Sequence, residues 1–211
     1  MIYAIISEKK FRERPVLRDL KMSINAGEFI VITGPSGTGK TTLLNILGLL
    51  DTNFLGHYYF EDKKIDFSKW EQLRKIRSEY FSYVFQDSFI NEKQSVLRNI
   101  LCSLDIHEHS SAKHEVCSLL DSVGLGYLNC TDSASNLSGG EKQRLALARA
   151  LIKKPSFILA DEPTASLDRN NKVVIMKILN EFVDSGGGVI MVTHDLDVIS
   201  GNVSVIRLKS M

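Results

Sequence analysis

The sequence of 211 residues has few cysteines, no long apolar run and almost no net charge. Its three cysteines, Cys102, Cys117 and Cys130, are odd in number and lack the spacing of zinc ligands, which argues against a disulfide framework and a metal site. No apolar run approaches the ~18 residues that a membrane-spanning helix needs. The net charge of +1 gives no reason to expect nucleic acid as a partner. We therefore expect reduced thiols in the cytoplasm and contact with a membrane only through another protein.

The hydrophobic content of 44% is enough for a sizeable core, and short apolar runs alternate with helical patterns. The continuous apolar runs Phe29–Thr33, Phe157–Ala160 and Val189–Thr193 predict strands that are buried on both faces. Further strands are expected at Ile2–Ile6, His57–Phe60 (as an edge strand), Tyr80–Phe85 and Val203–Leu208, and helices at Thr41–Leu50, Ser68–Ser78, Glu141–Lys153 and Lys172–Val183. Such alternation predicts an α/β fold around a mostly parallel sheet that helices cover on both faces.

The segment Asn91–Ser135 differs from its surroundings because it is richer in polar residues. Helical periodicity recurs around Val96–Leu104 and Lys113–Val123, and no strand pattern interrupts it. We therefore expect one domain, with a core formed by residues 1–90 and 136–211 and a helical lobe at 91–135.

Residues 34–41, GPSGTGKT, match the pattern G-x-x-x-x-G-K-[ST] between a predicted buried strand and a predicted helix. Gly34, Gly37 and Gly39 let the backbone turn its N–H groups towards phosphate oxygens, at the positive end of the following helix. Lys40 is expected to reach the β- and γ-phosphates, and the Thr41 hydroxyl to bind Mg²⁺. The alternative, a chance glycine-rich turn, is disfavoured by the flanking strand and helix. The expected phosphate site also includes Pro35, Ser36, Thr38 and Thr42.

Two carboxylates follow the predicted strand Phe157–Ala160. Asp161 comes at the carboxyl end of the strand, where open α/β sheets bind their ligands, and we expect it to hold Mg²⁺. Glu162 is one residue further and is expected to act as the general base towards water. A solvated acidic turn is the alternative, and the presence of the phosphate loop makes it less favourable.

Residues 137–144, LSGGEKQR, resemble the signature sequence of ATP-binding-cassette (ABC) proteins. Ser138 is a suitable N-cap, and Gly139 and Gly140 permit close approach of an anion to the start of the helix. The resemblance covers nearly all of the chain. It implies a P-loop NTPase core with an N-terminal antiparallel β region and a helical subdomain. It also implies a head-to-tail dimer, in which the signature of each copy closes over ATP held by the other.

Four other positions match the family in order along the chain, and their roles are implied by that resemblance. Gln86 is expected to touch Mg²⁺ and the attacking water, Asp168 to lie in a loop that contacts the opposite subunit, and His194 to sense the γ-phosphate. Phe11 stands where relatives usually carry a tyrosine that stacks on adenine. The alternatives are that Phe11 is a packed loop residue and that Tyr3, or no residue, stacks on the base.

The run Gly34–Asp51 is similar to the macrolide-exporter and lipoprotein-release branch, which includes systems for export of bacteriocins and for antimicrobial peptides. We therefore expect the ATP-hydrolysing subunit of a bacterial exporter, held at the inner face of the membrane by a separate integral membrane permease. One alternative is a cell-division type of ABC ATPase, acting as a membrane-associated switch without transport. Another is a module that binds nucleotide without turnover, which the presence of Glu162 and His194 disfavours.

Overall fold

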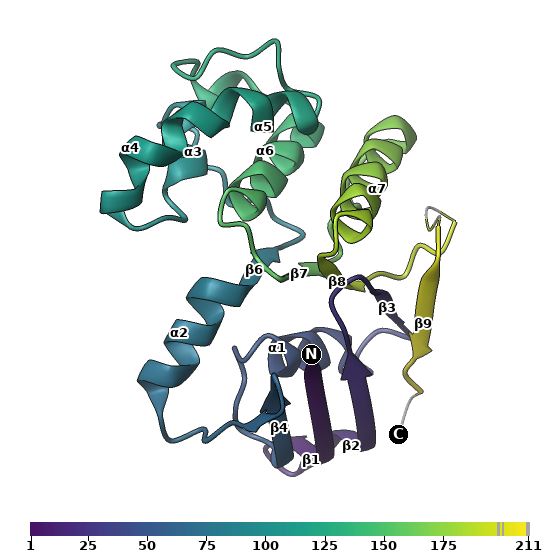
Figure 1. Ribbon diagram of the computed structural model, residues 1–211. Helices are drawn as coiled ribbons and strands as arrows, with labels where there is room; N and C mark the ends of the chain where they lie inside the picture. The colour runs from purple at the N-terminus through teal and green to yellow at the C-terminus, as the bar shows by residue number, and fades with distance from the viewer. Residues whose placement is uncertain (198, 200, 210–211) are drawn as a thin grey trace.

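The computed structural model describes residues 1–197, 199 and 201–209, which form two β-sheets with helices packed around them (Figure 1). The first sheet is antiparallel, in the order β2-β1-β4-β5, and the second is parallel throughout, in the order β6-β7-β8-β3-β9. The antiparallel strands are β1 (Ile2–Phe11), β2 (Arg14–Ile24), β4 (Leu55–Phe60) and β5 (Lys63–Lys64). The parallel strands are β3 (Phe29–Thr33), β6 (Phe81–Val84), β7 (Phe157–Asp161), β8 (Gly188–Val192) and β9 (Val203–Arg207). The predicted fold class is therefore confirmed.

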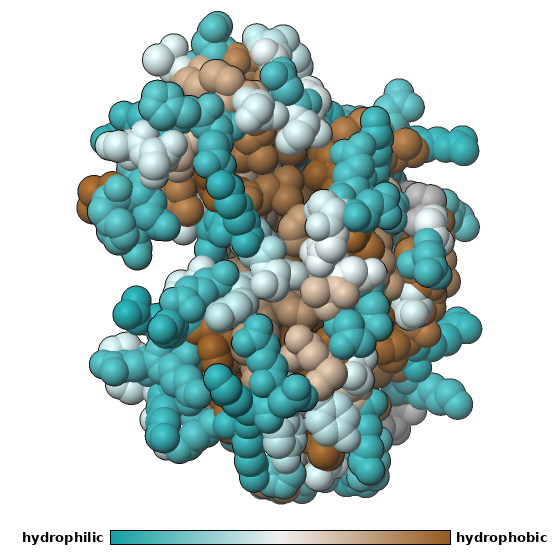
Figure 2. All heavy atoms as spheres, in the orientation of Figure 1, coloured by the Kyte–Doolittle hydropathy of each residue, from teal (hydrophilic) through white to brown (hydrophobic). Residues whose placement is uncertain are grey.

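Four longer helices pack around the sheets, and short helices fill the segment between β6 and β7. The longer ones are α1 (Lys40–Leu47), α2 (Trp70–Tyr80), α6 (Gly139–Leu151) and α7 (Arg169–Asp184). The short ones are α3 (Val96–Leu101), α4 (His109–Ala112) and α5 (Val116–Ser122), with 3₁₀ turns η1 (Ile106–Glu108), η2 (Lys113–Glu115) and η3 (Ala134–Asn136). Figure 1 shows α3–α6 gathered at one end of the molecule, away from β1, β2 and β4. On the face seen in Figure 2, a hollow with mostly hydrophilic side chains around it lies on the left of the view, between this end and the lower part of the molecule.

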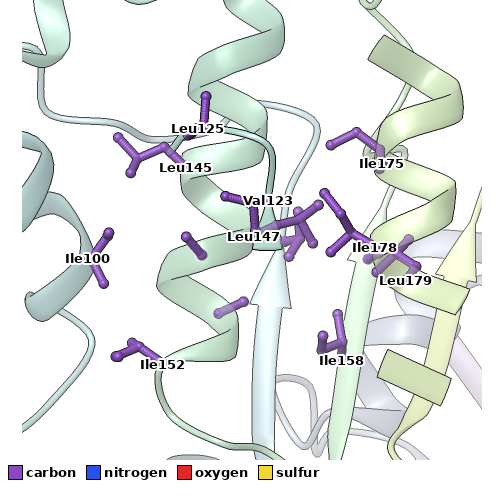
Figure 3. Close-up of a cluster of buried hydrophobic side chains, with 14 of the residues drawn as sticks. Ile100, Val123, Leu125, Leu145, Leu147, Ile152, Ile158, Ile175, Ile178 and Leu179 are labelled. Atoms are coloured by element: carbon purple, nitrogen blue, oxygen red, sulfur yellow. The ribbon is translucent and has the colours of Figure 1, made fainter. Parts of the chain in front are cut away.

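The parallel sheet separates two hydrophobic cores, because successive side chains of a strand point to opposite faces. In β3, Phe29 and Val31 belong to the core shared with α6 and α7, whereas Ile30 and Ile32 belong to the core shared with α1 and the antiparallel sheet. Both faces of β3 are buried, which explains its uninterrupted apolar sequence. Figure 3 shows the first core, with Leu145 and Leu147 of α6 between α3 and α7.

The antiparallel sheet departs most from the sequence-based expectation. Strand β1 is ten residues long rather than five, and the eleven-residue β2 was not predicted as a strand. Burial along β2 alternates regularly only from Leu20 to Ile24, so the period-2 signal of a strand covers less than half of it. Strand β4 is not at an edge, since it pairs with both β1 and the two-residue β5.

The cysteines and the helices bear on two of the expectations from the sequence. All three cysteines are free thiols. Among the residues that the structure describes, no helix is both long enough and apolar enough to cross a bilayer.

Candidate active site

A cavity of about 520 Å³ opens at the carboxyl ends of β3 and β7, where an open parallel sheet places its ligands. It extends from the turn between β1 and β2 to the acidic pair that follows β7. Ten of the predicted site residues line it, and they come from four separate parts of the chain. These ten are Phe11, Ser36, Gly37, Gly39, Lys40, Thr41, Thr42, Gln86, Asp161 and Glu162.

The phosphate loop takes a conformation that its glycines allow. Gly34, Gly37 and Gly39 all have positive φ, at 148°, 77° and 89°. A Cβ on Gly39 would lie 2.6 Å from a side-chain carbon of Val16, so β2 packs directly on the loop. The Lys40 ammonium donates hydrogen bonds to the carbonyls of Gly34 and Pro35, both at 3.0 Å, which holds its charge inside the loop.

Thr41 and Asp161, two of the residues expected to bind Mg²⁺, meet between the loop and the end of β7. The Thr41 hydroxyl donates a hydrogen bond of 3.2 Å to Asp161 Oδ1. Burial raises the pKa of Asp161 above its ordinary value, and the hydrogen bond from Thr41 opposes this shift. Gln86 lines the same cavity. These hydroxyl, carboxylate and amide oxygens are the donors that Mg²⁺ prefers, so the residues fit this ion.

Glu162 and His194 meet at the ends of two neighbouring strands, β7 and β8. His194 Nδ1 lies 2.8 Å from Glu162 Oε2. The Glu162 backbone has a φ of 51°, rare for this residue type, and its N–H donates to the Val192 carbonyl at 2.9 Å. The left-handed backbone turns the carboxylate out of the strand, and Glu162 lines the cavity while its side chain is only 17% exposed. His194 is 66% exposed and touches the cavity through Glu162.

Phe11 lines the cavity at the β1–β2 hairpin, and 54% of its surface is exposed. The Lys9 ammonium lies 5.0 Å from the ring centroid, a cation–π distance. Lys9 itself is buried and is held by Asp51, with an Nζ–Oδ2 distance of 2.6 Å. Tyr3 packs on Tyr59 in the middle of the antiparallel sheet and is not part of the cavity wall. The geometry therefore favours Phe11 over Tyr3 as the platform for a base.

The signature residues Ser138, Gly139 and Gly140 lie outside this cavity, at the start of α6. Ser138 caps the helix in a capping box: its N–H donates to Glu141 Oε2 at 2.7 Å, and its Oγ accepts from the Glu141 N–H at 3.4 Å. A Cβ on Gly140 would lie 2.3 Å from the Asn171 side chain, so only glycine lets α6 pack this closely on α7.

Asp168 is the N-cap of α7 and accepts a hydrogen bond of 3.0 Å from the Asn171 N–H. Asn171 in turn contacts Arg144 of α6. The structure thus ties the predicted subunit-contact residue to the signature helix, at a distance from the phosphate loop.

The capping box should make the stability of the fold depend on pH. Hydrogen bonds from the hydroxyl groups of Ser138 and Tyr127 are the main causes that lower the pKa of Glu141 to about 2, from 4.5. Because the pKa of Glu141 is lower in the folded state than in the unfolded state, ionisation of this carboxyl stabilises the fold above about pH 4.5. This stabilisation is lost as the pH falls towards 2. We therefore expect Glu141→Gln to lower the free energy of unfolding at pH 6 more than at about pH 2.5, measured by urea denaturation. The control is Glu71→Gln, in the first turn of α2, where no side chain caps the helix. An equal loss at both pH values would contradict the prediction.

Two residues of the cavity wall were missed from the sequence, Arg14 and Val16. Both lie in β2, the strand that was not predicted. No clear local signal pointed to them, because the turn residues Arg12 and Glu13 are not among the pairs that typically mark a two-residue hairpin.

Comparison with known proteins agrees with this geometry. Residues 17–165 match the family described as ABC transporter. The chain is 38% identical over 188 residues to YvrO of Bacillus subtilis, an uncharacterised ABC transporter ATP-binding protein, and this covers 88% of the chain and 82% of the relative. It is 36% identical over 194 residues to the macrolide export ATP-binding/permease protein MacB of Bdellovibrio bacteriovorus. That match covers 92% of the chain but only 30% of the relative.

Solved structures lead to the same family. A bacterial ABC transporter cassette solved as a dimer matches with a TM-score of 0.78 and 31% identity, over 99% of this chain and 94% of that one. A dimeric cassette in a post-hydrolysis state, bound to ADP and Pi, matches with a TM-score of 0.77 and 30% identity, over 99% and 94% of the two chains. The chain therefore belongs to the ABC transporter family, as a cassette that binds and hydrolyses ATP.

Proposed function

We propose that ATP binds with its base on Phe11 and its β- and γ-phosphates in the phosphate loop. The cavity supports this placement because it joins these two regions without interruption. Lys40 and the loop N–H groups hold the phosphates, and Thr41, Asp161 and Gln86 hold Mg²⁺. When bound there, Mg²⁺ neutralises charge on the β- and γ-phosphate oxygens.

Glu162 is the general base in this proposal. Its carboxylate accepts the proton of the water that attacks the γ-phosphorus, while the bond from that phosphorus to the bridging oxygen breaks and ADP leaves with this oxygen. His194 Nδ1, 2.8 Å from Glu162 Oε2, holds the carboxylate in place. Gln86, which lines the same cavity, orients this water. The contact between Glu162 and His194, beside the pair Thr41–Asp161, is the observation that carries this assignment.

The metal assignment makes a direct prediction. We expect Asp161→Asn to lose ATP hydrolysis about a hundredfold, because a neutral amide is a poorer Mg²⁺ ligand and removes a charge beside Thr41. Binding of ATP in excess EDTA should be unchanged. Asp62→Asn, in the turn after β4, is the control and should keep wild-type activity. Equal Mg²⁺ dependence of hydrolysis in Asp161→Asn and the wild type would contradict the role of Asp161.

The second half of the site comes, in this proposal, from another copy of the chain. Ser138, Gly139 and Gly140 form a second anion-binding helix start, yet they do not line the cavity that holds Lys40. A head-to-tail dimer brings this helix start of one copy over the phosphate loop of the other. Two matched cassettes were solved as dimers, which supports the arrangement. Asp168 is connected to the signature helix through Asn171 and Arg144. In the proposed dimer it contacts the opposite copy next to the signature residues.

A membrane permease is the third element of the proposal. A second cavity, of about 590 Å³, is lined by the exposed side chains of Phe85 and Phe89, by Gln86 and by Lys142 of the signature helix. Gln86 and Asp161 line both cavities. Through these two residues, a protein bound in the second cavity contacts the site that holds the nucleotide. The helical segment 91–135 moves as a subdomain in this coupling.

The relatives named MacB carry a permease in the same chain, and this supports an export function with a separate permease here. The protein then lies on the cytoplasmic face of the membrane. Affinity purification from detergent-solubilised membranes tests this part. Recovery of an integral membrane protein with the wild type, and its loss with Phe89→Glu but not with Leu55→Glu at another exposed apolar position, is the expected result. A cell-division type of switch would instead bring down a membrane protein that transports nothing when the pair is reconstituted in vesicles.

A further inference from the structure

The hairpin between β1 and β2 brings a second cation to the nucleotide cavity. Phe11 and Arg14 are directly opposite each other across the antiparallel pair, with Arg12 and Glu13 forming the turn. Residues that face each other in this way carry their Cβ atoms about 4.5–5.5 Å apart, on the same face of the sheet. Both side chains line the 520 Å³ cavity. Arg14 therefore stands beside the aromatic ring on which the base is proposed to stack.

The positive charge of Arg14 is not paired with any carboxylate in the described part of the chain. Its side chain is exposed, and no hydrogen bond or ion pair engages the guanidinium. Arg18, four residues further along β2, is instead paired with Glu8 at 2.7 Å. The other cation of the cavity wall is Lys40, whose ammonium is held by the carbonyls of its own loop. The cavity thus has one cation at its phosphate-loop end and one at its Phe11 end.

We propose that Arg14 binds the α-phosphate of the nucleotide. This rests on the proposed placement of the base on Phe11 and of the β- and γ-phosphates at Lys40. The α-phosphate is the first anionic group that follows the base and ribose, so it is the anion nearest to the hairpin. The planar guanidinium donates two parallel hydrogen bonds to a phosphate, which an ammonium group does not match. Arg14 is a binding residue for the nucleotide and takes no part in proton transfer.

The test compares Arg14→Gln with Arg12→Gln, a matched control because Arg12 is exposed in the same hairpin but does not line the cavity. We expect Arg14→Gln to raise the Kd of ADP and the KM of ATP about tenfold, and to leave kcat unchanged. Arg12→Gln should match the wild type. Arg14→Lys should recover only part of the loss, because it keeps the charge without the planar fork. Calorimetric titration with ADP and steady-state ATPase kinetics give these values.

Two results would overturn the assignment. One is the same Kd for ADP in Arg14→Gln and Arg12→Gln. The other is an equal loss of affinity for adenosine, measured by competition, since adenosine has no phosphate. Lys40→Ala separates this proposal from the one on which it rests. If Lys40→Ala and the wild type bind ADP with the same Kd, the proposed placement of the phosphates at Lys40 is wrong, independently of the result for Arg14→Gln.

Discussion

Glu162→Gln is expected to bind ATP as the wild type does and to hydrolyse it about 10²- to 10⁴-fold more slowly, which is the range for removal of a general base. Glutamine keeps the shape of the side chain and its contact with His194, but its amide does not accept the proton of the attacking water. We also propose that hydrolysis reopens the dimer, so the variant should accumulate as a dimer with ATP. Single-turnover kinetics and sedimentation in Mg-ATP measure the two effects.

The control for this prediction is Glu61→Gln. Glu61 also has a positive φ, 49°, but it lies in the turn between β4 and β5, away from the cavity. The Glu61→Gln variant should hydrolyse ATP at the wild-type rate. Wild-type turnover in Glu162→Gln would show that another group accepts the proton, and Asp161 would then be the nearest carboxylate to test.

Ser138→Arg should abolish steady-state ATP hydrolysis while leaving the Kd for ATP unchanged. The phosphate loop and Phe11 of the same chain are untouched, so nucleotide still binds. The large side chain instead projects from the start of α6, where the partner's γ-phosphate is proposed to lie, and the dimer does not close.

The same substitution also removes a helix cap, which by itself costs about 1 kcal/mol. Ser138→Ala removes the cap without adding bulk, so its loss of stability measures the contribution of the cap alone. Ser135→Arg adds the same bulk three residues earlier, at another exposed position, and should remain active. Full activity in Ser138→Arg would mean that the signature does not approach the γ-phosphate.

The parts of the molecule that the sequence predicts well are those in which one local rule determines the structure. The phosphate loop needs positive φ at Gly34, Gly37 and Gly39, and only glycine adopts such angles without cost, so the motif and its conformation coincide. Strand β3 is apolar at every position because both of its faces are buried. The helix α6 begins one residue after the serine that the sequence identifies as its cap.

The parts that were missed depend on pairing between distant residues. The first half of strand β2 has no regular alternation, because Val16 packs on the phosphate loop while Arg18 and Asp19 are both exposed. Arg14 becomes a cavity residue only through its register opposite Phe11, which the strand pattern alone does not give. The buried charge of Lys9 is likewise explained by Asp51, forty-two residues away. Such contacts are properties of the fold and leave no periodic mark in the sequence.

The claim that ATP is cleaved between two copies is tested most directly by mixing two inactive variants. Lys40→Ala lacks a working phosphate loop, and Ser138→Arg lacks a working signature. If the site is shared, a mixed dimer pairs the intact loop of one copy with the intact signature of the other, and the mixture regains ATP hydrolysis that neither variant shows alone. If each copy carries a complete site, the mixture stays at the sum of the two separate rates, and that result would contradict the shared site.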